Sequence, residues 1–151
     1  MKKILIILPT LENGGAERLH IYLANEWVKN NYIVEFIILQ NRTKLKHLLS
    51  NKIKVKILNV NKIRFSFFQL FLIFLFSRPN IIISAMWPLT SIAILAKIFS
   101  LSNSKLFTVD HCPYSQNYSK DLNINNKKLF KYIKYTYKFA FKNIVVSQTI
   151  K

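Results

Sequence analysis

The stretch KILIILPTLENGGAERLHIYLANEW, residues Lys3–Trp27, carries the strongest fold signal of the chain. The segment Lys3–Leu8 is a short apolar run, as expected for a strand that is buried on both faces of a sheet. After a loop that ends in two adjacent glycines, apolar residues recur at helical spacing, which predicts a helix from Ala16 to Asn30. The stretch therefore predicts a buried strand, a turn and an amphipathic helix.

The rest of the chain continues this alternation of strands and helices. Further strands are expected at residues 33–39, 54–60, 80–84, 105–110 and 143–147. Further helices are expected at residues 44–50, 65–76, 88–101 and 127–142. Strands that alternate with helices favour a parallel sheet with right-handed crossovers. We therefore predict a single α/β domain over residues 1–151, built on a Rossmann-like, doubly wound parallel sheet.

The composition excludes several classes of protein. A chain of 151 residues, 51% of them hydrophobic, can build a core, so intrinsic disorder is not expected. The single cysteine, Cys112, excludes an intrachain disulfide framework and a cysteine-built zinc site, and neither a metal nor a cofactor is expected. The uncharged run at residues 65–76 is too short to span a bilayer, so it is expected either in the core or inserted in a membrane surface.

The net charge of +17 has two interpretations. Nineteen of the 23 basic residues are lysines, and Asn, Ile and Phe are abundant, which is the mix that an AT-rich genome produces without a functional cause. The alternative is an anionic partner, namely a membrane surface, a substrate or nucleic acid. No nucleic-acid motif is visible and arginine, the better phosphate ligand, is scarce, so no nucleic-acid partner is expected.

The only two glycines of the sequence, Gly14 and Gly15, lie in the loop after the first expected strand. Ligands of doubly wound sheets bind outside the carboxyl ends of the strands, which selects residues 10–15, 85–88 and 111–115. Two glycines let the backbone approach a ligand, and the helix start offers its amides to phosphate or another anion. A tight turn without a ligand is the alternative. The pattern is not G-x-G-x-x-G, so a nicotinamide-dependent dehydrogenase is not expected.

The segment GGAER, Gly14–Arg18, with the helix LHIYLANEW after it, resembles the opening of family 4 glycosyltransferases. Further segments resemble that family in the right order: RPNIIISA at 78–85, WP at 87–88, FTVDH at 107–111 and NIVVS at 143–147. The resemblance implies the N-terminal, acceptor-side half of a two-domain GT-B enzyme. It implies transfer of a sugar from a nucleotide-sugar donor to an envelope saccharide or lipid-linked acceptor, with retention of configuration and without an obligatory metal.

The resemblance also implies roles for individual residues. His111 is implied to be the catalytic residue that orients the donor sugar. A neutral imidazole could hydrogen-bond a sugar hydroxyl, an imidazolium could stabilise the departing phosphate, and a purely structural histidine is the alternative. The residues implied to bind substrate are Gly14, Gly15 and Asp110. Glu17 and Arg18 are expected to support the loop and the helix start, and His20 on the same helix is expected to be structural.

The family's second domain holds the nucleotide sugar with an Arg…Lys pair and an E-x7-E motif, and neither is found in this sequence. We therefore expect an acceptor-side domain that lacks the nucleotide-sugar-binding domain and has little or no activity alone. A separate C-terminal half would complete such an enzyme. The alternatives are a gene remnant and a non-catalytic binding subunit that associates with a membrane.

The helix expected at residues 127–142 carries a stripe of lysines with aromatic residues between them. The lysines are Lys127, Lys131, Lys134, Lys138 and Lys142. Either they form a solvated face over a core-facing aromatic stripe, or they bind anionic headgroups while the aromatics lie in the membrane interface. Pro9 and Glu12 end the first apolar run too early for a signal peptide, so the expected location is the cytoplasm, free or peripheral on the inner face of the plasma membrane.

Overall fold

The computed structural model describes residues 1–60, 62–111 and 133–146, and these residues form one six-stranded, all-parallel sheet. The strands are β1 (Lys3–Leu8), β2 (Ile33–Ile38), β3 (Lys54–Ile57), β4 (Ile81–Ala85), β5 (Lys105–Asp110) and β6 (Lys142–Val145). Their order in the sheet is β3-β2-β1-β4-β5-β6. Strands β1 to β3 follow one another from the centre of the sheet to one edge, and strands β4 to β6 follow one another from the centre to the other edge. This order confirms the predicted Rossmann-like, doubly wound fold.

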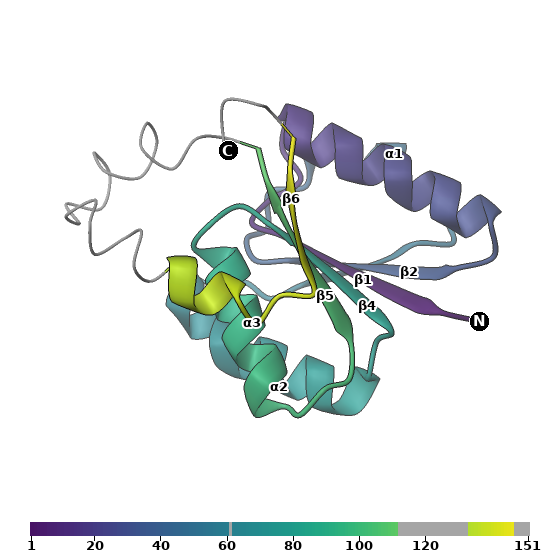
Figure 1. Ribbon diagram of the computed structural model, residues 1–151. Coiled ribbons are helices and arrows are strands. Elements are labelled where there is room, and N and C mark those ends of the chain that lie inside the picture. The colour runs from purple at the N-terminus through teal and green to yellow at the C-terminus, as the bar shows by residue number, and fades with distance from the viewer. Residues whose placement is uncertain (61, 112–132, 147–151) are drawn as a thin grey trace.

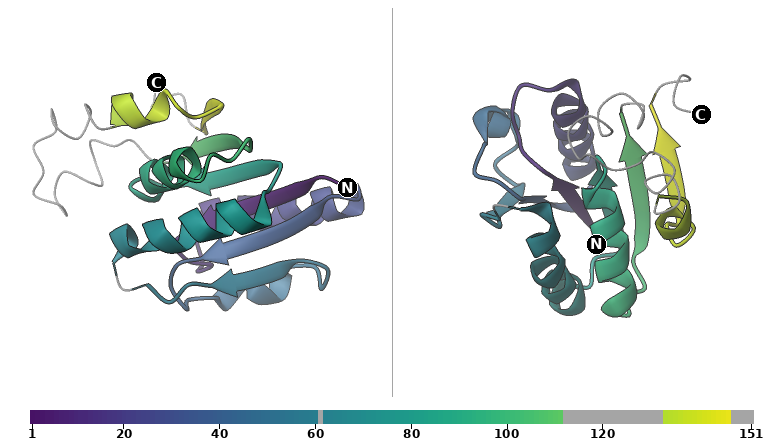
Figure 2. Two further views of the ribbon diagram at one scale, coloured as in Figure 1. Left: turned by 90° about the horizontal axis from the view of Figure 1, so that it is seen from below. Right: turned by 90° about the vertical axis from the view of Figure 1, so that its left-hand side faces the viewer.

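Helices cover both faces of this sheet (Figures 1 and 2). They are α1 (Gly15–Lys29), α2 (Ser66–Ser77) and α3 (Leu89–Phe99), with short 3-10 turns η1 (Lys44–Leu48) and η2 (Ile63–Phe65) and a helical turn at residues 133–137. α1 lies on one face, whereas α2 and α3 lie on the other (Figure 1). Parallel crossovers are right-handed, so the reversal of direction between β3 and β4 moves the connecting helix to the opposite face.

The central strand β1 shows why the sequence contains a continuous apolar run. Leu5 and Ile7 belong to the core under α2 and α3, whereas Ile6 and Leu8 belong to the core under α1. All four side chains are fully buried. A strand that is covered on both faces must be apolar at every position, which is why the run does not alternate with polar residues.

The helix predicted at residues 127–142 ends earlier than expected. Residues 133–137 are helical, but Lys142 begins β6. The preceding residue, Phe141, donates its amide to the Leu106 carbonyl at 2.7 Å, and its ring packs edge-on against Phe107 with centroids 5.3 Å apart. Pairing with β5 therefore overrides the helical pattern, and the prediction that Lys142 lies on the helical stripe is wrong.

The other lysines of the predicted stripe fall in two groups. Lys127 and Lys131 lie outside the described residues. Lys134, within the helical turn that packs on α3, and Lys138, just after it, are both exposed. In the described part of the chain, no helix is long and apolar enough to cross a membrane.

The residues with a left-handed backbone conformation in this structure are not glycines. Among the described residues, five non-glycine positions have positive φ and neither glycine does. The five are Asn31, Asn59, Arg78, Met86 and Leu101. Gly14 has φ −100° and ψ 156°, an extended conformation open to any residue. Neither glycine is therefore needed for a left-handed backbone conformation.

Candidate functional site

Four polar side chains, from α1, the last residue of β5 and the residue after it, gather at the carboxyl edge of the sheet, beside the point where the strand order reverses. They are Glu17, His20, Asp110 and His111. The first three are buried and His111 is half-buried. The two histidine rings meet edge to face with centroids 5.5 Å apart, and the charges of both carboxylates act on His111. The edge predicted from topology thus contains a compact group of titratable residues.

The Glu17 side chain folds back over Gly14. A Cβ atom at Gly14 would lie 2.0 Å from Glu17 Oε2, so the carboxylate occupies the space that a side chain would need. From the loop after β1, Thr10 Oγ1 donates to Glu17 Oε1 at 3.4 Å. Glu17 also lies in the first turn of α1, where a negative charge is favourable next to the helix dipole. Glu17 therefore ties the loop after β1 to the start of α1.

Gly15 leaves the same helix end open. A Cβ atom there would meet nothing within 4 Å. The first bond of the helix runs from the Arg18 amide to the Gly14 carbonyl at 3.2 Å, and no side chain caps the N-terminus. The Gly14 amide donates to the Glu12 carbonyl at 2.8 Å. The amides of Gly15, Ala16 and Glu17 have no acceptor within the helix, and an anion could approach the exposed one at Gly15 closely. The Arg18 side chain is exposed at this end of α1.

His20 is buried against the backbone of its own helix. Its Nδ1 lies 2.7 Å from the Ala16 carbonyl oxygen, and because a carbonyl only accepts, Nδ1 carries the proton. Burial lowers the pKa of His20, the bond to Ala16 opposes this shift, and the neighbouring His111 lowers the pKa further. His20 is therefore a neutral imidazole with a defined tautomer.

His111 also has a pKa below the ordinary histidine value. Burial is the main cause, and the charges of Asp110 and Glu17 partly oppose it. Its Nε2 atom is buried and has no hydrogen-bond partner among the described residues. Buried polar atoms normally have a partner, and since no described residue supplies one here, a ligand group could bind this nitrogen. A neutral ring with an open nitrogen suits a hydrogen bond to a hydroxyl better than the stabilisation of a phosphate by charge.

Asp110 is held by side chains from two other elements. The Tyr137 hydroxyl donates to Asp110 Oδ1 at 3.1 Å, and Thr90 Oγ1 lies 2.7 Å from the same hydroxyl. Because the single phenolic proton goes to the carboxylate, the Thr90 hydroxyl must donate to the tyrosine oxygen. The order of donation is therefore Thr90 to Tyr137 to Asp110, and it links α3, the 133–137 turn and β5.

The loop predicted after β4 reaches the same edge of the sheet. Met86, in the loop after β4, donates its amide to the Val109 carbonyl at 3.2 Å and has φ 67°. A left-handed non-glycine residue is strained and is often found at functional sites.

A cavity of about 370 Å³ lies beyond the carboxyl ends of β2 and β3. It is lined by Gln40, Asn41, Arg42, Asn59 and Val60.

The predicted site residues are partly brought together. Gly14, Glu17, Asp110 and His111 lie at one place, and Gly15 and Arg18 are at the exposed start of α1 next to it. The lysines Lys134, Lys138 and Lys142 are not part of this group. Residues 112–115 of the third predicted loop lie outside the described residues.

Sequence reasoning placed Thr10 in a selected loop and expected His20 to be structural, but it did not predict their contacts with Glu17 and His111, and it missed Tyr137. His20 follows Glu17 by three residues, so helical periodicity places both side chains on one face and could have identified the pair. Thr10 could have been suspected only as a polar residue in the glycine loop. Tyr137 is 47 residues from Thr90, and no local pattern connects them.

The fold defines a Rossmann-like domain, a class in which ligands bind at the carboxyl edge of the doubly wound sheet, where these side chains gather. The sequence model of Glycosyltransferase Family 4 matches residues 13–151. The chain therefore belongs to Glycosyltransferase Family 4, and the match covers the region of the N-terminal GT-B domain. No curated protein matches the chain. Membership of this family implies a sugar donor and an acceptor.

Proposed function

We propose that this domain is the acceptor-side part of an enzyme that transfers a sugar, with retention of configuration, from a nucleotide sugar to an envelope saccharide or a lipid-linked acceptor. The observation that carries the proposal is an open start of α1 in the neighbourhood of His111, on which the charge of Glu17 in the first turn of α1 acts. Gly15 leaves the first amides of α1 accessible, and His111 Nε2 is unpartnered among the described residues. One element offers donors for an anionic diphosphate, and the other offers a nitrogen for a sugar hydroxyl.

The proposed roles follow from this geometry. The Gly15 amide approaches the sugar or the diphosphate from the open start of α1, and His111 orients the donor sugar as a neutral imidazole. Gly14 lets the loop come close to the ligand, but its amide already donates to the Glu12 carbonyl at 2.8 Å. Asp110 binds a substrate hydroxyl from its fixed position beside Tyr137. Glu17 keeps the glycine loop closed over the start of α1, and Arg18 adds an exposed cation there.

The cavity beside β2 and β3 is the proposed position of the acceptor. Its lining includes two asparagines, a glutamine and Arg42, side chains that donate and accept hydrogen bonds in the way sugar hydroxyls require. Arg42 also lies 3.7 Å from Glu12 in the glycine loop, measured between Nη1 and Oε2. The acceptor and donor positions would therefore be neighbours along one edge of the sheet.

We further propose that the donor requires a second, nucleotide-sugar-binding domain, either elsewhere in a longer chain or in a separate polypeptide. Sugar transfer should be measured with a panel of nucleotide sugars, for this chain alone and with such a donor-binding half added. Turnover is expected only for the combination, and His111→Ala should lower kcat by about 10²-fold. His47→Ala is the control, since His47 is exposed on η1.

The alternative function is a binding subunit without chemistry of its own. Saccharide binding that persists in the combined protein while no nucleotide sugar is consumed would favour this alternative. Turnover by the purified chain alone would contradict the proposed need for a second domain. Unchanged kcat in His111→Ala would contradict the role given to that histidine.

A further inference from the structure

Helix α2 has no charged side chain, although one side of it faces solvent. Its sequence is SFFQLFLIFLFS, and the stripe formed by Ser66, Leu70 and Phe74 is buried against the sheet. The opposite stripe, at helical spacing from the preceding turn onward, is Phe65, Phe68, Leu72 and Phe76. Phe68 and Phe76 are 63% and 79% exposed. A surface helix normally has a polar outer face, and α2 has an aromatic one.

The exposed apolar surface continues onto α3. The two helices lie beside each other on the same face of the sheet (Figure 1), and Phe67 of α2 meets Phe99 of α3 edge to face at 5.8 Å. The α3 residues Leu95, Ile98 and Phe99 are exposed. We call the combined surface the α2–α3 apolar face; it comprises Phe65, Phe68, Leu72, Phe76, Leu95, Ile98 and Phe99. Contiguous apolar surface of this kind marks an interaction site.

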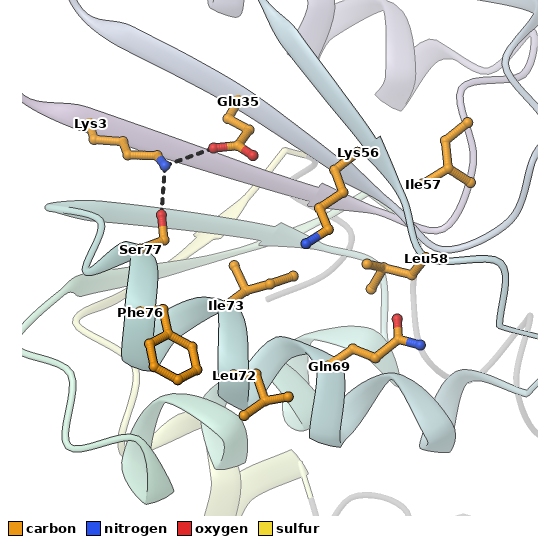
Figure 3. A pocket seen from close by; sticks show the side chains of 10 residues that line it. All are labelled: Lys3, Glu35, Lys56, Ile57, Leu58, Gln69, Leu72, Ile73, Phe76 and Ser77. Atoms are coloured by element: carbon orange, nitrogen blue, oxygen red, sulfur yellow. Dashed lines mark hydrogen bonds and ion pairs between the residues drawn. The ribbon is translucent and has the colours of Figure 1, made fainter.

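A cavity of about 710 Å³ adjoins this face between α2 and the β2–β3 edge (Figure 3). Leu72 and Phe76 line it, so it is continuous with the apolar face. Lys3 is already engaged there, because its Nζ contacts Glu35 Oε2 at 2.7 Å and Ser77 Oγ at 2.6 Å. Lys56 extends from β3 across the cavity toward α2. The cavity thus combines an apolar wall with a cation.

The charge of the residues around this face indicates which kind of partner binds to it. From residue 36 to residue 109 the sequence contains eleven basic residues and no acidic one. Basic residues stand at both ends of α2, near the end of α3 and at the start of β5, namely Lys62, Arg64, Arg78, Lys97 and Lys105. Lys134 and Lys138 follow on the helical turn that packs against α3. A second copy of a chain with a net charge of +17 would be repelled, whereas an anionic surface would be attracted.

We propose that the α2–α3 apolar face inserts into the interface of a bilayer that contains anionic lipids. α2 lies in the plane of the membrane with its phenylalanines among the upper acyl chains, and the flanking lysines and arginines contact headgroup phosphates. Lys56 receives one headgroup in the cavity beside α2. This binding does not depend on sugar transfer, so either proposal can fail without the other.

Vesicle flotation of the full chain tests this proposal. Wild-type protein should float with vesicles of phosphatidylcholine and phosphatidylglycerol at low salt, and much less with phosphatidylcholine alone or at high salt. The double variant F68S/F76S should weaken partitioning by about tenfold or more, because two exposed rings are lost from the membrane contact. The charge-reversal variant R64E/K97E should also weaken binding, and its effect should disappear at high salt.

The matched control is Y22S, which removes an aromatic ring of similar exposure, 64%, from α1 on the other face of the sheet. It should leave partitioning unchanged within about twofold. Circular dichroism and urea unfolding check that every variant is folded. Wild-type protein that fails to float, or F68S/F76S that floats like wild type, would overturn the proposal. So would a wild-type dimer, seen by light scattering, that F68S/F76S dissociates while no vesicles are bound.

Discussion

At the scale of single residues, the two glycines have different tasks although they are adjacent. A side chain at Gly14 would force the Glu17 carboxylate to move, because the carboxylate fills the space where the Cβ would be. Gly15 has open space at the same position. Gly14 therefore makes room for a side chain of the protein itself, and Gly15 leaves room for a ligand. Substituting alanine at each position tests the two roles separately.

Gly14→Ala should destabilise the domain by about 1 kcal/mol, since the buried Glu17 side chain must move away from Thr10. Gly15→Ala should be neutral or stabilising by up to about 1 kcal/mol, because alanine favours the helix and meets no neighbour. Urea unfolding measures both. A Gly15→Ala variant less stable than Gly14→Ala would contradict this assignment. In the assembled enzyme, Gly15→Ala should nevertheless weaken donor binding, because its methyl group lies beside the open amides.

The histidine pair makes stability depend on pH. Burial lowers the pKa of both His20 and His111 below the unfolded value of 6.5, so below that pH the unfolded chain binds more protons than the folded one. The free energy of unfolding should therefore fall as pH is lowered from 7.5 through 6.5 toward the depressed pKa values. The slope should not exceed about 1.4 kcal/mol per pH unit for each histidine.

His20→Asn should flatten this pH dependence, because asparagine can still donate to Ala16 but does not titrate. His47→Asn is the matched control: His47 makes the same kind of local bond, to the Lys44 carbonyl at 2.8 Å, but is exposed. Chemical unfolding at a series of pH values gives the slopes. Equal flattening by both substitutions would show that burial of His20 is not the cause.

At the scale of secondary-structure elements, Tyr137 joins three parts of the fold. Tyr137→Phe removes one donor to the buried Asp110 carboxylate and the acceptor for Thr90. Its cost should be about 2 kcal/mol, because hydrogen bonds to charged groups are the stronger ones. The control is Tyr135→Phe, two residues away and exposed. Urea unfolding compares the two, and similar midpoints would contradict a stabilising role for the Thr90–Tyr137–Asp110 chain.

The elements also show how far sequence patterns reach. β1 and α1 were predictable, since a doubly buried strand and an amphipathic helix each have a distinct local pattern. The helix at 65–76 was predictable, but its exposure was not, because an uncharged helix is compatible with both a core and a membrane surface. The sequence did not predict that the helix ends at residue 137, because lysines continue at helical spacing into β6. The chain becomes a strand there because Phe141 pairs with β5. The contacts of His20 and Tyr137 depend on elements distant in sequence, so only the folded structure reveals them.

At the scale of the whole molecule, the charge is strongly unbalanced, with 23 basic and six acidic residues. Mutual repulsion should reduce the stability of the folded state. Added NaCl shortens the screening length from about 30 Å at ~0.01 M to about 3 Å at ~1 M, so it should stabilise the domain by about 1 kcal/mol, or ~3 °C in Tm. Thermal unfolding at several salt concentrations measures this.

The matched variant for the salt experiment is K44E/K46E/K52E, which reverses exposed charges in and after η1, away from the α2–α3 apolar face. It should be more stable at low salt and less sensitive to added NaCl than the wild-type chain. A wild-type Tm that is independent of salt would mean that repulsion among the excess positive charges does not lower the stability of the folded state.

The glycine pair has a practical consequence for spectroscopy. Because Gly14 and Gly15 are the only glycines in the sequence, protein labelled with ¹⁵N in glycine alone should give two amide resonances, both from the start of α1. Neither needs a triple-resonance assignment of the whole chain, since Gly15→Ala removes one of them. A nucleotide sugar or saccharide that docks at this edge would shift these signals directly, so a ligand screen could be read from a two-line spectrum.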